Sequence, residues 1–345
     1  MCGSRAGADV LFHDGEEVVP MIKSLMVVGC GSIGQRHALN AKLLGVKEIL
    51  LCDIDGARAR KFADSIGTDL VFESYEKAFE AHPEIEAAII ATPSGLHIEP
   101  ALYLAGHEVN IFIEKPLSDT LKGTTKLIDL VRGKGIVGMM GQSYRFHEGF
   151  LALKELLDSG ATGRPLHVLY ILGQYLPDWH PEMDYRKEYT AQKRLGGGAL
   201  LTSMSHGFDT LQWLFGNATR VQGWKTKLGD LEIDVDDSVF CVMKTDRNVV
   251  IQCHVDFLQR ESRHQIIVFG EKGHIEVDFI KNQIRLWTID TKVSRTISYQ
   301  HDTNKRYVEE LKYFFNLISE KKTDHLLDLA SGRQILELIM NIVQV

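Results

Sequence analysis

The amino-acid sequence predicts an α/β protein with two domains: a parallel-sheet domain over residues 21–143, and an α+β domain with a large, mostly antiparallel sheet over residues 144–345. In the first segment, short apolar runs alternate with stretches of helical composition, which is the rhythm of β-α-β units. In the second, longer runs alternate apolar with polar residues, which favours strands packed on one face. A chain of 345 residues is long enough to form two cores.

The clearest local feature is a glycine pattern that follows the first apolar run, residues 24–28. Gly29 permits a tight turn, Gly31 removes a side chain where a pyrophosphate must approach, and Gly34 lets the next helix pack close to the strand. The unpaired N–H groups at the start of that helix would face the pyrophosphate oxygens. A glycine turn in an unrelated α/β protein is the alternative, but a strand before it and a helix after it favour a dinucleotide site. Its predicted residues are Gly29, Gly31, Ser32, Ile33 and Gly34.

A carboxylate follows at the distance expected for such a site. The second apolar run, residues 48–52, ends at Asp53, which is 19 residues after Gly34 (53 − 34 = 19). An acid in this place accepts the two ribose hydroxyls of an adenosine and repels a 2′-phosphate. We therefore predict NAD as the preferred cofactor. Arg58 and Arg60, in the next helix, could turn toward a phosphate, so that NADP stays possible.

The next apolar strand, residues 87–91, delivers polar residues to the same edge of the sheet. Ligands of open parallel sheets bind at the carboxyl ends of the strands. We therefore expect Thr92, Pro93 and His97 to lie beside the nicotinamide half of the dinucleotide. For His97, a capping or packing role is an equal alternative.

The strand over residues 109–113 repeats this design and ends in Glu114-Lys115-Pro116. Glu114 and Lys115 are predicted to border the cofactor. A lysine at the mouth of a sheet can hold a substrate hydroxyl or move its proton if desolvation lowers its pKa. The alternative is a solvated surface lysine, which is the usual state of this residue type.

Composition excludes several classes of function. A net charge of −7 without clustered Lys and Arg argues against a nucleic-acid partner. No apolar run approaches the roughly 18 residues of a membrane span. The five cysteines lack metal-site spacing, so we expect them to be reduced and expect no metal site. Residues 1–20 lack the order of a signal peptide and are predicted to be an appended or disordered arm, which together with the cysteines indicates a cytoplasmic protein.

The second domain carries a further set of candidate residues. The glycines at 196–198 precede a predicted helix on which Thr202, His206 and Asp209 share one face. The strip over residues 173–186 is rich in groups that suit a sugar. An ordinary surface loop is the alternative for any one of them. The chain is expected to end in helices near residues 305–319 and 331–343, which are free to pack back on the first domain. The substrate-binding candidates are Tyr144, Arg145, Trp179, His180, Thr202, His206 and Asp209.

With these motifs in place, the chain resembles the glucose-fructose oxidoreductase, inositol dehydrogenase and MocA family of NAD(P)-dependent dehydrogenases. The resemblance runs from Met21 to the C-terminus. Four motifs carry it in the right order: residues 29–37, residues 91–97, Glu114-Lys115-Pro116, and residues 196–209.

The resemblance implies a Rossmann dinucleotide-binding domain followed by a domain whose sheet roofs the active site. It makes Lys115 the catalytic lysine and His206 a catalytic histidine that shares the proton transfer on a sugar or polyol hydroxyl, while hydride moves to the nicotinamide. The departure is Thr202, because many relatives carry Asp there. Either Asp209 or an acid from residues 178–184 replaces that carboxylate, or His206 only positions the substrate.

The predicted function is therefore NAD(P)-dependent oxidation or reduction of a sugar, polyol or nucleotide sugar. Two other functions fit the same fold: a dinucleotide-binding sensor or scaffold, and a sugar elimination or hydrolysis that retains the cofactor. Apolar residues are also expected on the outer face of the second sheet, where they favour a homodimer or homotetramer. These residues are Leu169, Ile171, Val242 and Val250.

Overall fold

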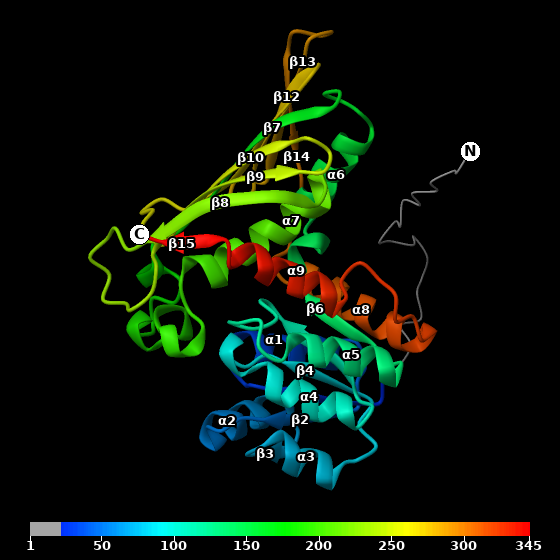
Figure 1. Cartoon of the computed structure of the whole chain (residues 1–345). Helices are drawn as coiled ribbons and strands as arrows, with labels where there is room; N and C mark the ends of the chain where they lie inside the picture. The colour runs from blue at the N-terminus through cyan, green and yellow to red at the C-terminus, as the bar shows by residue number, and fades with distance from the viewer. Residues whose placement is uncertain (1–21) are drawn as a thin grey trace.

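The structure, a computed structural model, describes residues 22–345. The arm predicted over residues 1–20 and Met21 lie outside the described residues. Two sheets are stacked end to end, with the helices α8 (Lys305–Glu320) and α9 (Leu329–Ile339) between them (Figure 1). Among residues 22–345, no helix combines the length and the apolar character that crossing a bilayer requires.

The first sheet is parallel throughout, as predicted, with the strand order β3-β2-β1-β4-β5-β6. Every residue of the central strands β1 and β4 is buried, because helices cover both faces of the sheet. The order reverses between β1 and β4, which is where open parallel sheets bind their ligands. The strands are β1 (Ser24–Val28), β2 (Glu48–Cys52), β3 (Val71–Phe72), β4 (Ala87–Ile90), β5 (Asn110–Glu114) and β6 (Gly138–Gly141).

Helices connect these strands and bury their apolar stripes against the sheet. Asp55 caps the second of them by accepting the N–H of Arg58 at 3.0 Å, and Gly67 ends it in a left-handed conformation. The helices are α1 (Ser32–Leu43), α2 (Gly56–Ile66), α3 (Tyr75–Ala81), α4 (Ile98–Gly106) and α5 (Thr124–Lys134).

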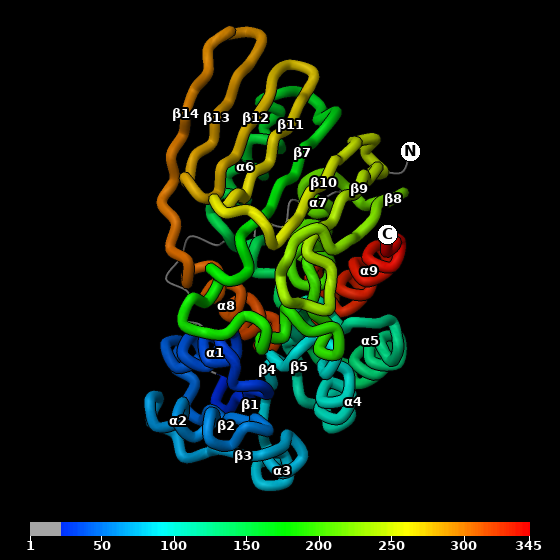
Figure 2. Tube along the Cα trace, turned by 90° about the vertical axis from the view of Figure 1, so that its left-hand side faces the viewer, coloured from blue at the N-terminus to red at the C-terminus, as the bar shows by residue number. Residues whose placement is uncertain are grey.

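The second sheet has the order β14-β13-β12-β11-β7-β10-β9-β8-β15, and its pairs are antiparallel except β7 with β10 and β8 with β15. Figure 2 shows its strands side by side. The strands are β7 (Pro165–Gly173), β8 (Ala218–Thr226), β9 (Ser238–Thr245), β10 (Val250–Asp256), β11 (Arg263–Gly270), β12 (Gly273–Asp278), β13 (Gln283–Thr288), β14 (Ser294–Ser298) and β15 (Ile342–Gln344).

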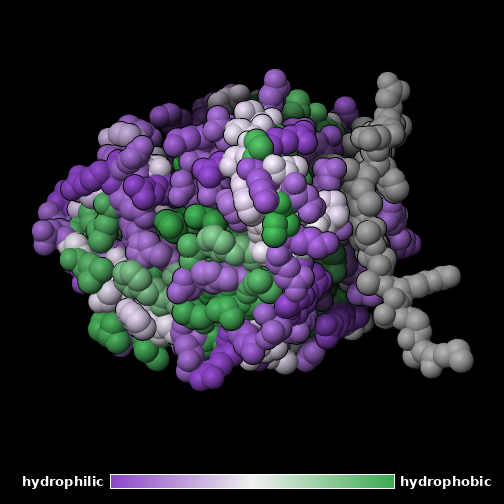
Figure 3. All heavy atoms as spheres, turned by 90° about the horizontal axis from the view of Figure 1, so that it is seen from above, coloured by the Kyte–Doolittle hydropathy of each residue, from purple (hydrophilic) through white to green (hydrophobic). Residues whose placement is uncertain are grey.

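The two faces of this sheet differ as the alternation of the sequence predicts. On β7, Val168 and Tyr170 are buried under α7 (Ser205–Phe215), while Leu169 and Ile171 face the other way and stay partly exposed. On β9 and β10, Val242 and Val250 are exposed on that outer face. Seen from above, apolar side chains gather at the centre of the surface and polar ones surround them (Figure 3). The helix α6 (Glu148–Asp158) lies with α7 on the inner face.

The C-terminal segment differs from the prediction at its end. The helix expected over residues 331–343 stops at Ile339, and Ile342–Gln344 form β15, which extends the sheet beside β8. Val343 and Gln344 are exposed, so this edge strand has no alternating pattern that the sequence could reveal. The preceding helix, α8, packs on α1, where Asn40 and Asn304 exchange two hydrogen bonds of 3.3 and 2.8 Å.

Candidate active site

The glycine turn has the geometry that a dinucleotide requires. Gly29 has φ +98°, and a Cβ there would lie 2.7 Å from the carbonyl oxygen of Ala91. A Cβ on Gly34 would lie 1.9 Å from the carbonyl oxygen of Gly29, so the helix packs too closely for any side chain. A Cβ on Gly31 would meet no atom of the surrounding residues within 4 Å, which leaves open space on that side for a phosphate. No side chain caps α1 at Gly31, and its first N–H groups, those of Ser32 and Ile33 included, are free to meet an anion.

Asp53 stands at the end of β2 as predicted, and its carboxylate is held in place by the backbone. Its oxygens accept the N–H groups of Cys30 at 2.7 Å and Asp55 at 2.8 Å. The guanidinium of Arg58 also bonds both oxygens, at 2.6 and 3.2 Å. The predicted ribose acceptor therefore carries an arginine beside it.

His97 joins the ends of β4 and β5. Its Nδ1 lies 3.0 Å from the carbonyl oxygen of Pro116, and its Nε2 lies 2.7 Å from that of Thr92. The ring is buried, and burial lowers its pKa. The ring thus lies between the loops that carry Thr92 and Lys115, and a neutral imidazole donates to only one of the two carbonyl oxygens.

Glu114 is buried next to His37 of α1, with 2.7 Å between Oε1 and Nε2. Burial acts to raise the pKa of Glu114, but the hydrogen bond and charge of His37, together with the charge of Lys115, hold it below its ordinary value. Glu114 thus provides a fixed negative charge directly behind the predicted catalytic lysine.

Lys115 links the two domains. Its Nζ donates a hydrogen bond of 2.8 Å to the carbonyl oxygen of Thr202. Burial lowers the pKa of Lys115 to about 8; the charge of Arg306 adds to this effect and that of Glu114 opposes it. A lysine with such a pKa exchanges a proton near neutral pH, which the solvated alternative would not do.

The segment that carries Thr202 is a π-helical turn, Leu200–Met204, which runs into α7. Such turns often occur at functional sites. The Thr202 hydroxyl donates to the carbonyl oxygen of Gly198 at 2.8 Å, so it is used within its own turn.

Among residues 22–345, no carboxylate forms a hydrogen bond or ion pair with His206. Its Nδ1 is buried without a hydrogen-bond partner, and its ring stacks on Tyr144 with 4.4 Å between centroids. Burial, helped by the charges of Lys115 and Arg306, lowers its pKa well below the ordinary value. The imidazole is therefore neutral at physiological pH.

Asp209 does not replace the carboxylate that is missing at position 202, because both of its oxygens are bonded to Arg145. The guanidinium donates two hydrogen bonds of 2.9 and 2.8 Å to the two Asp209 oxygens, and both side chains are buried. The pair fastens the turn Ser143–Phe146 to α7. Arg145 and Asp209, both predicted to bind the substrate, bond each other and connect the elements that carry Tyr144 and His206.

Three residues of the strip 173–186, Trp179, His180 and Asp184, are engaged with their neighbours. The Trp179 ring lies edge-on to Phe257 at 5.2 Å, and its Nε1 is buried without a partner. Nδ1 of His180 lies 2.9 Å from both oxygens of Glu188, while Asp184 pairs with Arg186. In this set the Trp179 indole is left with an unused donor.

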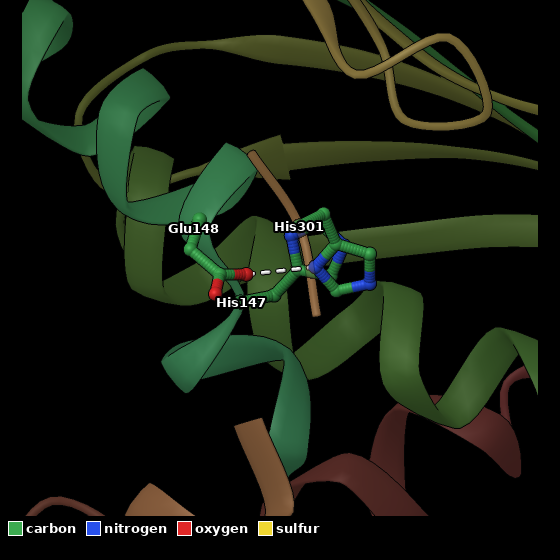
Figure 4. A group of neighbouring side chains, drawn as sticks. All are labelled: His147, Glu148 and His301. Atoms are coloured by element: carbon green, nitrogen blue, oxygen red, sulfur yellow. Dashed lines mark hydrogen bonds and ion pairs between the residues drawn. The ribbon is translucent and has the colours of Figure 1, made fainter. Parts of the chain in front are cut away.

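A second group of histidines lies beyond Tyr144 (Figure 4). His147 stacks on His301 with 4.0 Å between ring centroids, and Nδ1 of His301 lies 2.7 Å from Oε2 of Glu148. Ligand atoms of these three residues lie within 4.8 Å of one another, as in a metal site. However, Nδ1 of His147 already accepts the N–H of Gly149 at 3.0 Å. The group ties the chain before α8 to the start of α6.

Several residues near Lys115 could not be found by sequence reasoning. His37 reaches the site from α1, and Arg306, Tyr307 and Glu310 reach it from α8. Only His37 lies within a motif of the resemblance. The others lie about 190 residues after Lys115 in an ordinary amphipathic helix, and no local pattern connects them to the sheet.

Comparison with known proteins shows which family the chain belongs to. Residues 23–142 match the model of the oxidoreductase family with an NAD-binding Rossmann fold, and residues 150–276 match the GFO/IDH/MocA C-terminal domain. Myo-inositol 2-dehydrogenase of Thermotoga maritima is 26% identical over 303 residues, which cover 84% of this chain and 86% of that protein. Inositol 2-dehydrogenase of Burkholderia ambifaria is 28% identical over 200 residues, or 57% of this chain and 55% of that protein.

Solved structures of similar fold include levoglucosan dehydrogenase in complex with NADH and levoglucosan, with a TM-score of 0.81 at 21% identity, covering 92% of this chain and 95% of that one. UDP-N-acetylglucosamine 3-dehydrogenase of Acidithiobacillus ferrooxidans has a TM-score of 0.75 at 18% identity and covers 92% and 96%. The two matched models, the glycine turn and the fold together place this chain in the GFO/IDH/MocA family of oxidoreductases, with an NAD-binding Rossmann domain at its N-terminal end.

Proposed function

We propose that this oxidoreductase transfers a hydride between NAD and a hydroxyl-bearing carbon of a sugar or polyol, with Lys115 as the group that accepts or returns the hydroxyl proton. When bound, the nicotinamide supplies the hydride acceptor at C4. The turn at residues 29–34 would hold the pyrophosphate and Asp53 the ribose. The site faces the second domain, whose relatives by name act on inositol, levoglucosan or a nucleotide sugar.

The observation that carries this proposal is the position of Lys115. Its amine is buried at the carboxyl end of β5, has a pKa of about 8, and reaches across to Thr202. A general base works best when its pKa lies near the working pH. In its neutral form Lys115 takes the proton from the substrate hydroxyl, and Thr202 orients the amine through its carbonyl oxygen.

We assign His206 a positioning and hydrogen-bonding role. A neutral imidazole, stacked on Tyr144 with an unused Nδ1, offers a hydrogen bond to a substrate hydroxyl. Because no carboxylate holds its tautomer or raises its pKa, it does not take the main part in proton transfer. Trp179 would supply a flat apolar face to the sugar ring.

The test is oxidation of a panel of sugars, polyols and nucleotide sugars with NAD+, followed by the absorbance of NADH. A member of the panel should be oxidised in proportion to enzyme. If NAD binds but no compound is turned over in either direction, the protein is a dinucleotide-binding sensor. Release of an elimination or hydrolysis product with no net NADH would support the third function.

We further propose that the protein is cytoplasmic and forms a homodimer or homotetramer through the outer face of its second sheet. Val242 and Val250 are exposed there, with 46% and 38% of their surface accessible, and Trp224 on the neighbouring β8 is 50% exposed. An apolar face of this kind is typical of a surface that a partner subunit covers.

A further inference from the structure

The guanidinium of Arg306 lies among the groups of the candidate site although its residue is far from them in sequence. Its Cζ is 5.1 Å from the centre of the Tyr144 ring, whose other contacts include the stacked ring of His206. Its charge acts on the pKa of Lys115, His206 and His264. These side chains come from the end of β5, from α7 and from β11, so the guanidinium lies near elements of both domains.

The position of Arg306 is fixed from both sides. Before it, His301 is tied to Glu148 at 2.7 Å (Figure 4). Asn304 is hydrogen-bonded to Asn40. After it, the hydroxyl of Tyr307 accepts a hydrogen bond of 2.9 Å from Nη2 of Arg306. These contacts hold the backbone on both sides of Arg306 and its guanidinium in place.

Arg306 lacks a counter-ion among residues 22–345, where no carboxylate forms an ion pair with it. The carboxylates around it are in use: His37 bonds Glu114, and Arg145 bonds both oxygens of Asp209. Glu310 is fully buried, and burial with the charge of Glu114 raises its pKa well above the ordinary value, which favours its neutral form. The half-buried guanidinium keeps its charge, and its Nε–H is buried without an acceptor.

An unpaired donor of this kind costs free energy unless a ligand supplies an acceptor. The planar fork of a guanidinium matches the two oxygens of a carboxylate or a phosphate. A neutral polyol offers only single hydroxyl acceptors and no charge. Lys115 adds a second cationic group on the same side of the site, within a protein whose net charge is −7.

We propose that the substrate is an anionic sugar, bearing a carboxylate or a phosphate group, and that Arg306 binds this group and so selects charged over neutral sugars. The inference rests on the proposed function and narrows its substrate class. The hydroxyl that reacts stays at Lys115, and the anionic group lies toward α8. Packing on Tyr144 and Tyr307 alone would explain the aromatic contacts of Arg306, but not its unused Nε–H.

The experiment compares each neutral sugar with its charged counterpart. Hexoses, their uronic and aldonic acids and their phosphates are assayed with NAD+ in the wild type and in Arg306→Met, which keeps the apolar stem on Tyr144. Lys305→Met is the matched control, because it removes one charge from the adjacent residue, whose side chain is exposed and whose Nζ lies 3.8 Å from Glu148. Binding of glucuronate and glucose 6-phosphate to the NADH-loaded protein is measured by calorimetry as a readout independent of turnover.

We expect kcat/KM to favour a charged sugar over its neutral counterpart by at least about tenfold, and Arg306→Met to lower the value for the charged sugar on the order of ten- to a hundredfold. In Arg306→Met the kcat/KM for the neutral sugar should change little. In Lys305→Met the values for both sugars should change little. Preference for the acids or for the phosphates would identify the anionic group.

Two results would overturn the inference: wild-type enzyme that handles neutral sugars as well as charged ones, or Arg306→Met that lowers both equally. Failure of the proposed function is seen separately. If nothing is oxidised but an anionic sugar binds in a way that requires Arg306, the binding inference holds and the dehydrogenase function does not. If neither anion binds and nothing is oxidised, both are wrong.

Discussion

Nζ of Lys115 lies 2.8 Å from the carbonyl oxygen of Thr202, and this hydrogen bond joins the end of a strand in the parallel sheet to a π-helical turn of the second domain. The contact uses the backbone of residue 202, so threonine or aspartate in this place can orient the lysine equally well. The side chain at 202 is bonded within its own turn, to the carbonyl oxygen of Gly198. Under the proposed roles, a threonine here leaves His206 without a neighbouring carboxylate and keeps Lys115 as the proton acceptor.

Lys115→Met should keep NAD binding and lower kcat by about a hundredfold or more, the usual share of a general acid-base group. Backbone groups of the glycine turn hold the pyrophosphate, so the cofactor does not depend on this amine. Fluorescence titration with NADH and steady-state rates check the two parts. His206→Ala should lower kcat by a smaller factor. If Lys115→Met kept its turnover while His206→Ala abolished it, the roles would have to be exchanged.

The rate of alcohol oxidation should rise with pH through an apparent pKa near 8. The charged amine of Lys115 cannot accept a proton, and burial lowers its pKa from 10.5 to about 8, so the active neutral form grows as pH increases through that value. His206 stays neutral over this range and adds no inflection of its own. A profile of kcat/KM between pH 6 and 10 is the measurement. A single inflection near 6.5, the ordinary value of histidine, would contradict the assignment.

Asp209→Asn should destabilise the fold strongly, because it leaves the buried guanidinium of Arg145 without its counter-charge. Loss of one partner from a buried ion pair costs about 3 to 5 kcal/mol. The control is Asp184→Asn, which breaks an exposed pair with Arg186 and should leave the unfolding midpoint nearly unchanged. Urea unfolding of the three proteins gives the comparison, and equal midpoints for the two variants would contradict a structural role for Asp209.

NAD should bind more tightly than NADP, because Asp53 repels a 2′-phosphate. Asp53→Asn removes the repulsion and frees Arg58 from its bonds of 2.6 and 3.2 Å, so the ratio of the two affinities should shift toward NADP on the order of tenfold. Titration with NADH and NADPH measures both constants. NADP binding as tight as NAD in the wild type would show that Arg58, rather than Asp53, decides the preference.

Val242→Lys combined with Val250→Lys should reduce the size of the assembly in solution, since both residues stand on the exposed outer face of the second sheet. Light scattering at micromolar concentration measures the mass. Leu43→Lys is the control, because Leu43 is equally apolar, 71% exposed and located at the end of α1, away from the sheet. A wild-type protein that is monomeric at this concentration would contradict the predicted oligomer.

The sequence by itself determined the parts of the protein that are local. The turn at Gly29, the strands that lead directly to Asp53 and Lys115, and the alternation on β7 are confirmed. Each depends on a short apolar run, a glycine conformation or a spacing of a few residues, which a linear pattern records.

Only the tertiary structure decided which groups meet. His37 pairs with Glu114, and Arg145 pairs with Asp209. The charge of Arg306 acts on Lys115 from a helix that the sequence presents as an ordinary amphipathic one. β15 is also a product of the fold, because a short exposed edge strand forms only where β8 offers it hydrogen bonds. Pairing between residues tens to hundreds of positions apart depends on how the helices pack against the two sheets, and a hydrophobic pattern carries no information on which polar side chains then become neighbours.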